Sequence, residues 1–354
     1  MGLVRHQTVM HCKPAQDKQM TDITPSIYIL SSERSGTNLL RSLLSNHPQY
    51  DGPIPVHFFD TFYRYAGRYG DLHKPDAMQK LLHDAVILAN HPYHDWKLQI
   101  SSDQLFEKCR PTDLFAAFLA LYRTWCEEQG KRGMICKDNN LFHYAFYIRA
   151  HEPSARFIYL YRDPRAYCAS WKGVPAMNKT TYQNAKQWAA EQTQCLDLIA
   201  THGIDCVPVA YEELVSNTQA VIDRIFSHVG VATDSQCYQI AAGKNDEAAS
   251  RNEFWKNINK PIFDSGAGGY RKKLSGDEIA MIEVITGSVM QRLDYQPEAK
   301  TVWEKPRWFS VQEKWRKKKL QRTAFKGAAL LQSKTELMRQ IQSGQLQDKQ
   351  AGKQ

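Results

Sequence analysis

Short apolar runs alternate with amphipathic stretches along most of the chain. The runs predict buried strands over residues 27–30, 133–136, 156–161 and 205–209. Leucines and aromatic residues at helical spacing predict helices just before His47-Pro48 and over residues 112–129, 140–151 and 276–293. Strands that alternate with helices favour a three-layer α/β/α fold, in which a central parallel sheet carries helices on both faces.

A polar cluster follows each predicted strand. The clusters are Ser32–Asn38, Lys137-Asp138, Arg162–Arg165 and Tyr211-Glu212. In open parallel sheets, ligands bind outside the carboxyl ends of the strands. These clusters are therefore the predicted components of one site.

The chain changes composition near residue 300. Its net charge is +9, and from Lys300 onward 14 Lys or Arg stand against 4 Asp or Glu, so the basic character belongs to the C-terminal part. We expect a polar leader over residues 1–24, one domain over residues 25–299, and a basic, partly helical tail over residues 300–354. With 42% hydrophobic residues, the domain can bury a large core.

The basic tail allows three interpretations. Its most cationic stretch, Glu313–Arg322, lies close to Trp303, Trp308, Phe309 and Trp315. The tail can be a solvated helix that packs its aromatic side chains on the domain. It can also be a docking surface for an anionic substrate or an anionic membrane face. Nucleic-acid binding is the third interpretation, but no recognised module supports it, so no nucleic-acid partner is expected.

No apolar leader or membrane-length run is visible, and the mean hydropathy is −0.54. The sequence therefore predicts a cytoplasmic protein, with the tail as its means of peripheral contact with a membrane. The eight cysteines are scattered without a C-x-x-C pair, which favours reduced thiols.

The loop Ser32–Asn38 joins a predicted strand to a predicted helix. Such a turn directs backbone N–H groups and the positive end of the helix dipole at one point, where an anion binds. Gly36 permits close approach of the backbone, Ser35, Thr37 and Asn38 offer donors, and Arg34 supplies a planar cation. The loop lacks the Gly-Lys-Ser/Thr of a nucleoside-triphosphate loop, which disfavours a kinase or NTPase.

A second element, Arg162–Trp171, also follows a strand. Arg162 ends the strand, and Ser170 lies about two helical turns further on. Together they can bind a second phosphate group. The alternative is a structural arginine and a serine on a helix surface.

Both elements resemble those of the sulfotransferases that use 3′-phosphoadenosine 5′-phosphosulfate (PAPS). The match rests on Arg34–Leu40, Asn46-His47-Pro48, and Arg162 with Ser170, and its strand context covers roughly residues 26–293. The resemblance implies a P-loop-like fold like that of bacterial, Golgi and tyrosylprotein sulfotransferases. It implies metal-independent, in-line transfer of a sulfuryl group from PAPS to an acceptor hydroxyl or amine, with adenosine 3′,5′-bisphosphate as product. The first loop would hold the 5′-phosphosulfate and the second the 3′-phosphate.

Weaker matches extend the expected site. Lys137 corresponds to a family lysine near the leaving group, and Tyr211 to a tyrosine near the adenosine part. The segments Ser265-Gly266 and Gly269–Lys272 resemble the late cofactor-binding loop, which adds Arg271 and Lys272. Each residue also has a structural interpretation, as a solvated charge or a core aromatic.

The expected general base is missing. Tyrosylprotein sulfotransferases carry a glutamate shortly after the His-Pro pair, where this chain has Pro55. His57 is the nearest capable base, with Asp51 and Asp60 as alternatives. The missing glutamate leaves open a nucleotide-binding protein that has lost the chemistry. The aromatic segment 52–110 suits carbohydrate, phenol, lipid or peptide acceptors alike.

Overall fold

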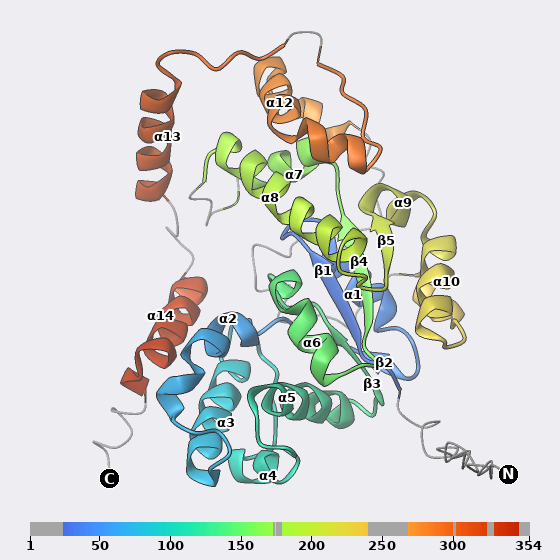
Figure 1. Ribbon diagram of the computed structural model, residues 1–354, viewed down its shortest axis with the longest axis vertical. Helices are drawn as coiled ribbons and strands as arrows, with labels where there is room; N and C mark the ends of the chain where they lie inside the picture. Colours follow the sequence, from blue (N-terminus) through green and yellow to red (C-terminus); the bar gives the residue numbers. More distant parts are fainter. Residues whose placement is uncertain are drawn as a thin grey trace, which may run out of the picture.

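The computed structural model describes residues 24–172, 174, 179–239, 268–299, 302–323 and 329–346. Within this part, five parallel strands form one sheet in the order β2-β3-β1-β4-β5 (Figure 1). The strands are β1 (Ile27–Ser31), β2 (Tyr50–Asp51), β3 (Gly133–Cys136), β4 (Arg156–Tyr161) and β5 (Cys206–Ala210). The predicted α/β fold with a central parallel sheet is confirmed.

Helices precede, separate and follow the strands. The α-helices within and beside the sheet region are α1 (Thr37–Leu44), α2 (Phe58–Phe62), α3 (Pro75–Ala89), α4 (Ser102–Glu107), α5 (Leu114–Glu128), α6 (Ala145–His151), α7 (Pro164–Trp171), α8 (Thr181–Ala200), α9 (Tyr211–Ser216), α10 (Thr218–Val229) and α12 (Gly276–Arg292). Two more, α13 (Phe309–Thr323) and α14 (Ala329–Ser343), follow in the tail. Short 3₁₀ segments are η1 (Tyr63–Tyr69), η2 (Leu141–Tyr144), η3 (Ser235–Tyr238) and η4 (Gly269–Lys272).

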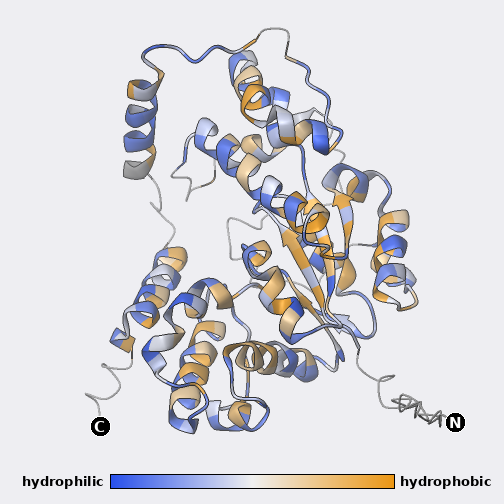
Figure 2. Cartoon of the chain, viewed as in Figure 1, coloured by the Kyte–Doolittle hydropathy of each residue, from blue (hydrophilic) through white to orange (hydrophobic). Residues whose placement is uncertain are grey.

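The central strand β1 faces two separate cores. Ile27 and Ile29 pack with residues of α1 and α10 on one face of the sheet. Tyr28 and Leu30 pack with α3, α5 and α6 on the other. Because successive side chains of a strand point to opposite faces, a wholly apolar run is what a strand buried on both sides requires. Figure 2 shows the strands in the middle of the sheet largely in the colour of hydrophobic residues.

Two predicted elements differ in detail from the structure. The segment after Asn140 begins as the 3₁₀ turn η2 and becomes α-helical only at Ala145. The sheet also gains the edge strand β2, which pairs Tyr50 with Gly133 and Asp51 with Met134. Two residues are too few to show a period, so sequence pattern could not reveal this strand.

The two tail helices differ in their surroundings. Helix α13 is mostly hydrophilic (Figure 2); Trp308 just before it and Trp315 within it are exposed, whereas Phe309 is buried against Tyr182 and Trp303. Helix α14 lies beside α2 and α3, and its Ile341 joins the larger core (Figure 1). No helix in the described part of the chain is long and apolar enough to cross a membrane.

Candidate active site

The turn between β1 and α1 has the backbone of an anion-binding loop. Arg34 and Gly36 adopt left-handed conformations, with φ of 65° and 98°. Gly36 is the N-cap of α1, and no side chain caps the first turn of this helix. The N–H groups of that turn, which begins with Thr37 and Asn38, therefore remain available to a ligand.

Gly36 is required because an aromatic ring packs directly on the loop. A Cβ at this position would lie 2.4 Å from Cδ2 of Tyr211. The guanidinium of Arg162 lies 4.2 Å from the centroid of the same ring, and its Nη1 donates to the Arg34 carbonyl over 3.2 Å. The structure thus brings three predicted components together: the loop, Arg162 and Tyr211.

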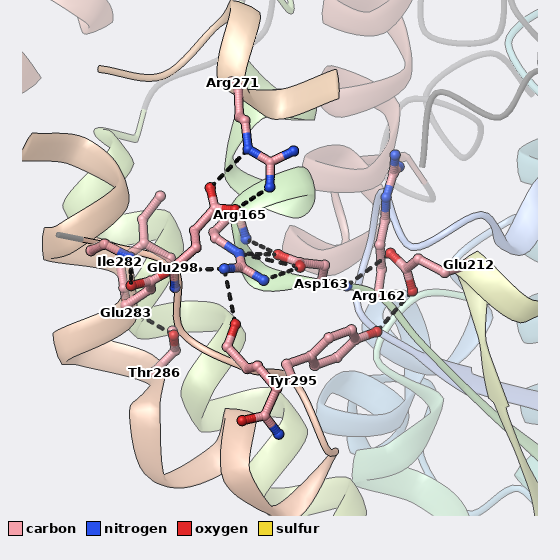
Figure 3. A network of polar contacts seen from close by, with 12 residues as sticks. Arg162, Asp163, Arg165, Glu212, Arg271, Ile282, Glu283, Thr286, Tyr295 and Glu298 are labelled. Atoms are coloured by element: carbon pink, nitrogen blue, oxygen red, sulfur yellow. Dashed lines mark hydrogen bonds and ion pairs between the residues drawn. The ribbon is translucent and has the colours of Figure 1, made fainter. Parts of the chain in front are cut away.

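The Arg162–Arg165 turn is held by a buried ionic network (Figure 3). The guanidinium of Arg165 pairs with Asp163 at 2.6 Å and with Glu283 of α12 at 2.7 Å. Asp163 also caps α7 by accepting from the Arg165 N–H, and its own N–H donates to Glu212. The side chain of Arg162 extends away from this network. The second arginine of the motif therefore fixes the turn, and the first is left for the site.

Cations accumulate at the strand ends. Burial and the neighbouring charge of Arg162 both lower the pKa of Arg34. Lys137 is only 7% exposed, and burial, followed by the charges of Arg41 and Arg34, lowers its pKa to about 7. Like charges at close range destabilise one another until an anion joins them.

Unsatisfied polar atoms lie in the same place. The Ser35 hydroxyl is fully buried, and among the described residues it has no hydrogen-bond partner. The same holds for Nε of Arg162. Buried polar groups in folded proteins are nearly always hydrogen-bonded, so these atoms fit an anionic ligand that accepts from them.

The remaining predicted cofactor residues are Ser170, Arg271 and Lys272, and Ser265 with Gly266. The Ser170 hydroxyl donates to the Tyr167 carbonyl over 2.7 Å, one helical turn back. Arg271 and Lys272 are exposed, and Arg271 is ion-paired with Glu298 (Figure 3). Ser265 and Gly266 lie outside the described residues.

A single carboxylate, that of Asp138, holds the backbone at the start of α2. Asp138 accepts from the backbone N–H groups of His57 (3.2 Å) and Phe58 (2.7 Å), and from the Tyr122 hydroxyl (2.7 Å). His57 has a φ of 57° and is the N-cap of α2. Asp138 thus ties the start of α2 to the end of β3, so that His57 lies near Lys137.

The His57 ring is held in its neutral form. Burial lowers its pKa well below 6.5, and the charges of Lys334, His94 and Lys137 act in the same direction. A neutral imidazole has a lone pair with which to accept a proton.

The two alternative bases, Asp60 and Asp51, already accept hydrogen bonds from neighbouring groups. Asp60 accepts from Asn140 (2.8 Å) and from the Tyr144 hydroxyl (3.2 Å). Asp51 accepts from the N–H of Gly52 over 2.7 Å, at the edge of the sheet. Each carboxylate therefore has a structural partner, whereas the His57 ring has no hydrogen-bond partner among the described residues.

Sequence reasoning missed His94 and Lys334 as members of this region. It placed Asp138 in the polar cluster with Lys137 at the end of a strand, but gave it no role of its own. The ring of His94 lies 6.3 Å from that of His57. Lys334 was hidden in the basic composition of the tail.

The family model described as "Sulfotransferase family" matches residues 25–235, and the chain belongs to this family. The match ends at the start of η3. It therefore includes β1 to β5 and, with them, the loop Ser32–Asn38, Lys137, Arg162 and Tyr211.

Two solved structures share the fold. One is the sulfotransferase domain from the Synechococcus PCC 7002 olefin synthase, with a TM-score of 0.55 and 23% identity over 80% of this chain and 99% of that one. The other is the sulfotransferase domain from the curacin biosynthetic pathway, with a TM-score of 0.51 and 20% identity over 77% and 99%. Among curated proteins, none matches significantly.

Proposed function

We propose that this sulfotransferase uses PAPS as its donor and forms adenosine 3′,5′-bisphosphate. The observation that carries the proposal is the pairing of Arg34 with Arg162 beside the uncapped start of α1. The charge of Arg162, which is close enough to lower the pKa of Arg34, and the buried Ser35 hydroxyl without a partner among the described residues match a ligand with two separate phosphate groups. A nucleoside triphosphate would instead need a Gly-Lys-Ser/Thr loop, which this chain lacks.

Each element of the site would bind a part of this donor. The loop Arg34–Asn38, with Lys137, would hold the phosphosulfate end. Arg162, with Ser170 at the end of α7, would hold the 3′-phosphate. The Tyr211 ring would lie beside the adenosine, and Arg271 with Lys272 would close the site from η4. Arg271 must then exchange its partner Glu298 for the ligand.

The chain's own residues would act mainly by positioning and charge. Bound PAPS supplies the sulfuryl group, whose bond to the phosphate oxygen breaks as the acceptor oxygen bonds to sulfur. Arg34 and Lys137 would stabilise the negative charge that develops on the oxygens around this bond. His57 would accept the proton of the acceptor hydroxyl. None of these roles uses a metal.

Incubation with sulfur-labelled PAPS and a panel of carbohydrate, phenol, lipid and peptide acceptors tests the function. We expect label transfer to at least one class. Tight binding of adenosine 3′,5′-bisphosphate without any transfer would instead indicate a nucleotide-binding protein without chemistry. Hydrolysis of ATP would indicate the kinase or NTPase alternative.

We expect the substitution His57→Asn to lower kcat by about 10²–10⁴-fold, because it removes the base that accepts the proton. Asn is the suitable replacement because it tolerates the left-handed backbone of this position. The wild-type rate should also fall at pH values below the pKa of His57, and that limb should disappear in the variant. Full activity of His57→Asn at every pH would exclude His57 as the base.

A further inference from the structure

Helix α14 presents a lysine on its buried face. Leu337, Met338 and Ile341 pack against the larger core, and Lys334 lies three, four and seven residues before them. This spacing places all four on one side of the helix. Lys334 is 7% exposed, at a position where an apolar residue would be expected. The helix therefore docks through apolar contacts and carries an ammonium group into the protein.

The contacts of α14 place Lys334 on the acceptor side of the site. Its ammonium lies 5.0 Å from the centroid of the Tyr93 ring. The adjacent Ser333 hydroxyl shares a hydrogen bond of 2.9 Å with Nε2 of His91. Further along the helix, Gln342 donates to the carbonyl of Asp60 in α2, over 3.3 Å. These contacts join α14 to α2, whose N-cap is His57, and to the turn after α3 (Figure 1).

Lys334 has no direct anionic partner in the part of the chain that the structure describes. Among the described residues, no carboxylate lies within ion-pair distance of its ammonium, and it makes no hydrogen bond. Three carboxylates are near enough to act on its charge, but Asp138 and Asp60 accept from other donors, and Glu33 accepts from Asn139. Burial lowers the pKa of Lys334 to about 8. Burial of an unpaired ammonium costs several kcal/mol, which an arriving anion would offset.

His94 provides a second unsatisfied group in the same region. It is 1% exposed, and the backbone of Pro55 lies close enough to the ring to raise its pKa as a hydrogen-bond partner would. The contact does not reach hydrogen-bond geometry, so neither ring nitrogen has a well-formed hydrogen bond to any described residue. Burial, with the charge of Lys334 next, lowers its pKa well below 6.5, so the ring is neutral and can donate one N–H.

We propose that Lys334 and His94 form a subsite for a carboxylate group of the acceptor, so that the enzyme sulfates the hydroxyl of a hydroxy acid. The inference rests on the proposed function and names the acceptor class of the same site. The ammonium of Lys334 with the neutral imidazole of His94 matches a ligand group that carries a single negative charge. A phosphate monoester, which carries about two charges, would call for a second cation.

Matched acceptor sets test the subsite. Each set contains a hydroxy acid, its methyl ester, and an analogue that carries a phosphate monoester in place of the carboxylate. The acceptor hydroxyl is that of a phenol, a primary alcohol or a secondary alcohol. Binding is measured by calorimetry with adenosine 3′,5′-bisphosphate present. We expect the wild type to bind at least one acid 10-fold or more tightly than its ester. The substitution Lys334→Met should reduce this preference below threefold, whereas Lys80→Met, at an exposed position of α3, should retain it.

Three results would overturn the assignment: equal binding of acid and ester in every set, tighter binding of the phosphate, or an unchanged preference in Lys334→Met. Unfolding cannot imitate the expected loss, because Lys334→Met removes an unpaired buried charge and should melt no lower than the wild type.

The nucleotide separates this inference from the proposed function. If adenosine 3′,5′-bisphosphate does not bind the wild type, the proposed donor is wrong. The acid and ester are then compared without it, and the same three results decide on the subsite. Lys334→Met should bind the nucleotide as the wild type does.

Discussion

The substitution Arg34→Ala is expected to lower kcat by about 10²–10³-fold, equal to about 3–4 kcal/mol of transition-state stabilisation. The reason is the position of the guanidinium. Arg34 lies in the loop Ser32–Asn38, and its backbone carbonyl accepts a hydrogen bond from Arg162. Its charge lowers the pKa of Lys137. Its removal deletes one of two fixed cations from the region where charge would develop. Sulfuryl transfer at saturating acceptor, measured with labelled PAPS, checks this.

The matched control is Arg149→Ala, at an exposed position on α6, which should keep full activity. Arg34→Ala should fold normally, because both residues carry a Cβ and the strain of the left-handed backbone is unchanged. Near-normal turnover in Arg34→Ala would remove the arginine from the mechanism and leave Lys137 as the only candidate cation near the leaving group.

The substitution Lys137→Met should also cost about 10²–10³-fold in kcat, and Lys137→Arg should change the pH dependence. In the free enzyme the pKa of Lys137 is about 7, against 10.5 for an ordinary lysine. The protonated form is the one that stabilises an anion. The kcat/KM for PAPS should therefore fall as pH rises through about 7, because this parameter reports the groups of the free enzyme.

Arginine stays protonated throughout this range, so Lys137→Arg should flatten the fall above pH 7 even if its absolute rate is lower. The lowered pKa of Lys137 also makes the stability of the fold depend on pH. Because the pKa of Lys137 in the folded protein lies below its unfolded value, the protonated group weakens folding, and stability should rise as pH increases from about 7 to 10.5. An alkaline limb that is the same in the wild type and in Lys137→Arg would show that another group titrates.

The sequence indicated which residues converge around Arg34 far better than which residues surround His57. The first group sits on local patterns: Arg34 and Gly36 follow one strand, and Arg162 follows another. In a parallel sheet such residues must converge, so local signals suffice. The structure adds the reason for Gly36, the packed Tyr211 ring, which no local pattern contains.

The surroundings of His57 depend on contacts between segments that are distant in the sequence. Phe58 and Asp138 are 80 residues apart, and Lys334 comes from the far end of the chain. Neither contact has a periodic signature. Lys334 did leave a trace, since a lysine interrupts the apolar stripe of α14, but within a highly basic tail the interruption looks ordinary. The predicted boundary at residue 299 remains a proposal, and the packing of α14 on the core argues that the tail contributes to the site.

Asp138 has a mechanical consequence. Lys137 and Asp138 are joined by one peptide bond, and the Asp138 carboxylate accepts hydrogen bonds from the backbone N–H groups of His57 and Phe58 at the start of α2. A displacement of the end of β3 therefore carries the ammonium and the imidazole together. The relative position of the two backbones is set by covalent geometry and by the two hydrogen bonds that Asp138 accepts. The start of α2 and the end of β3 should therefore move as one unit, and the side chains of Lys137 and His57 move with them.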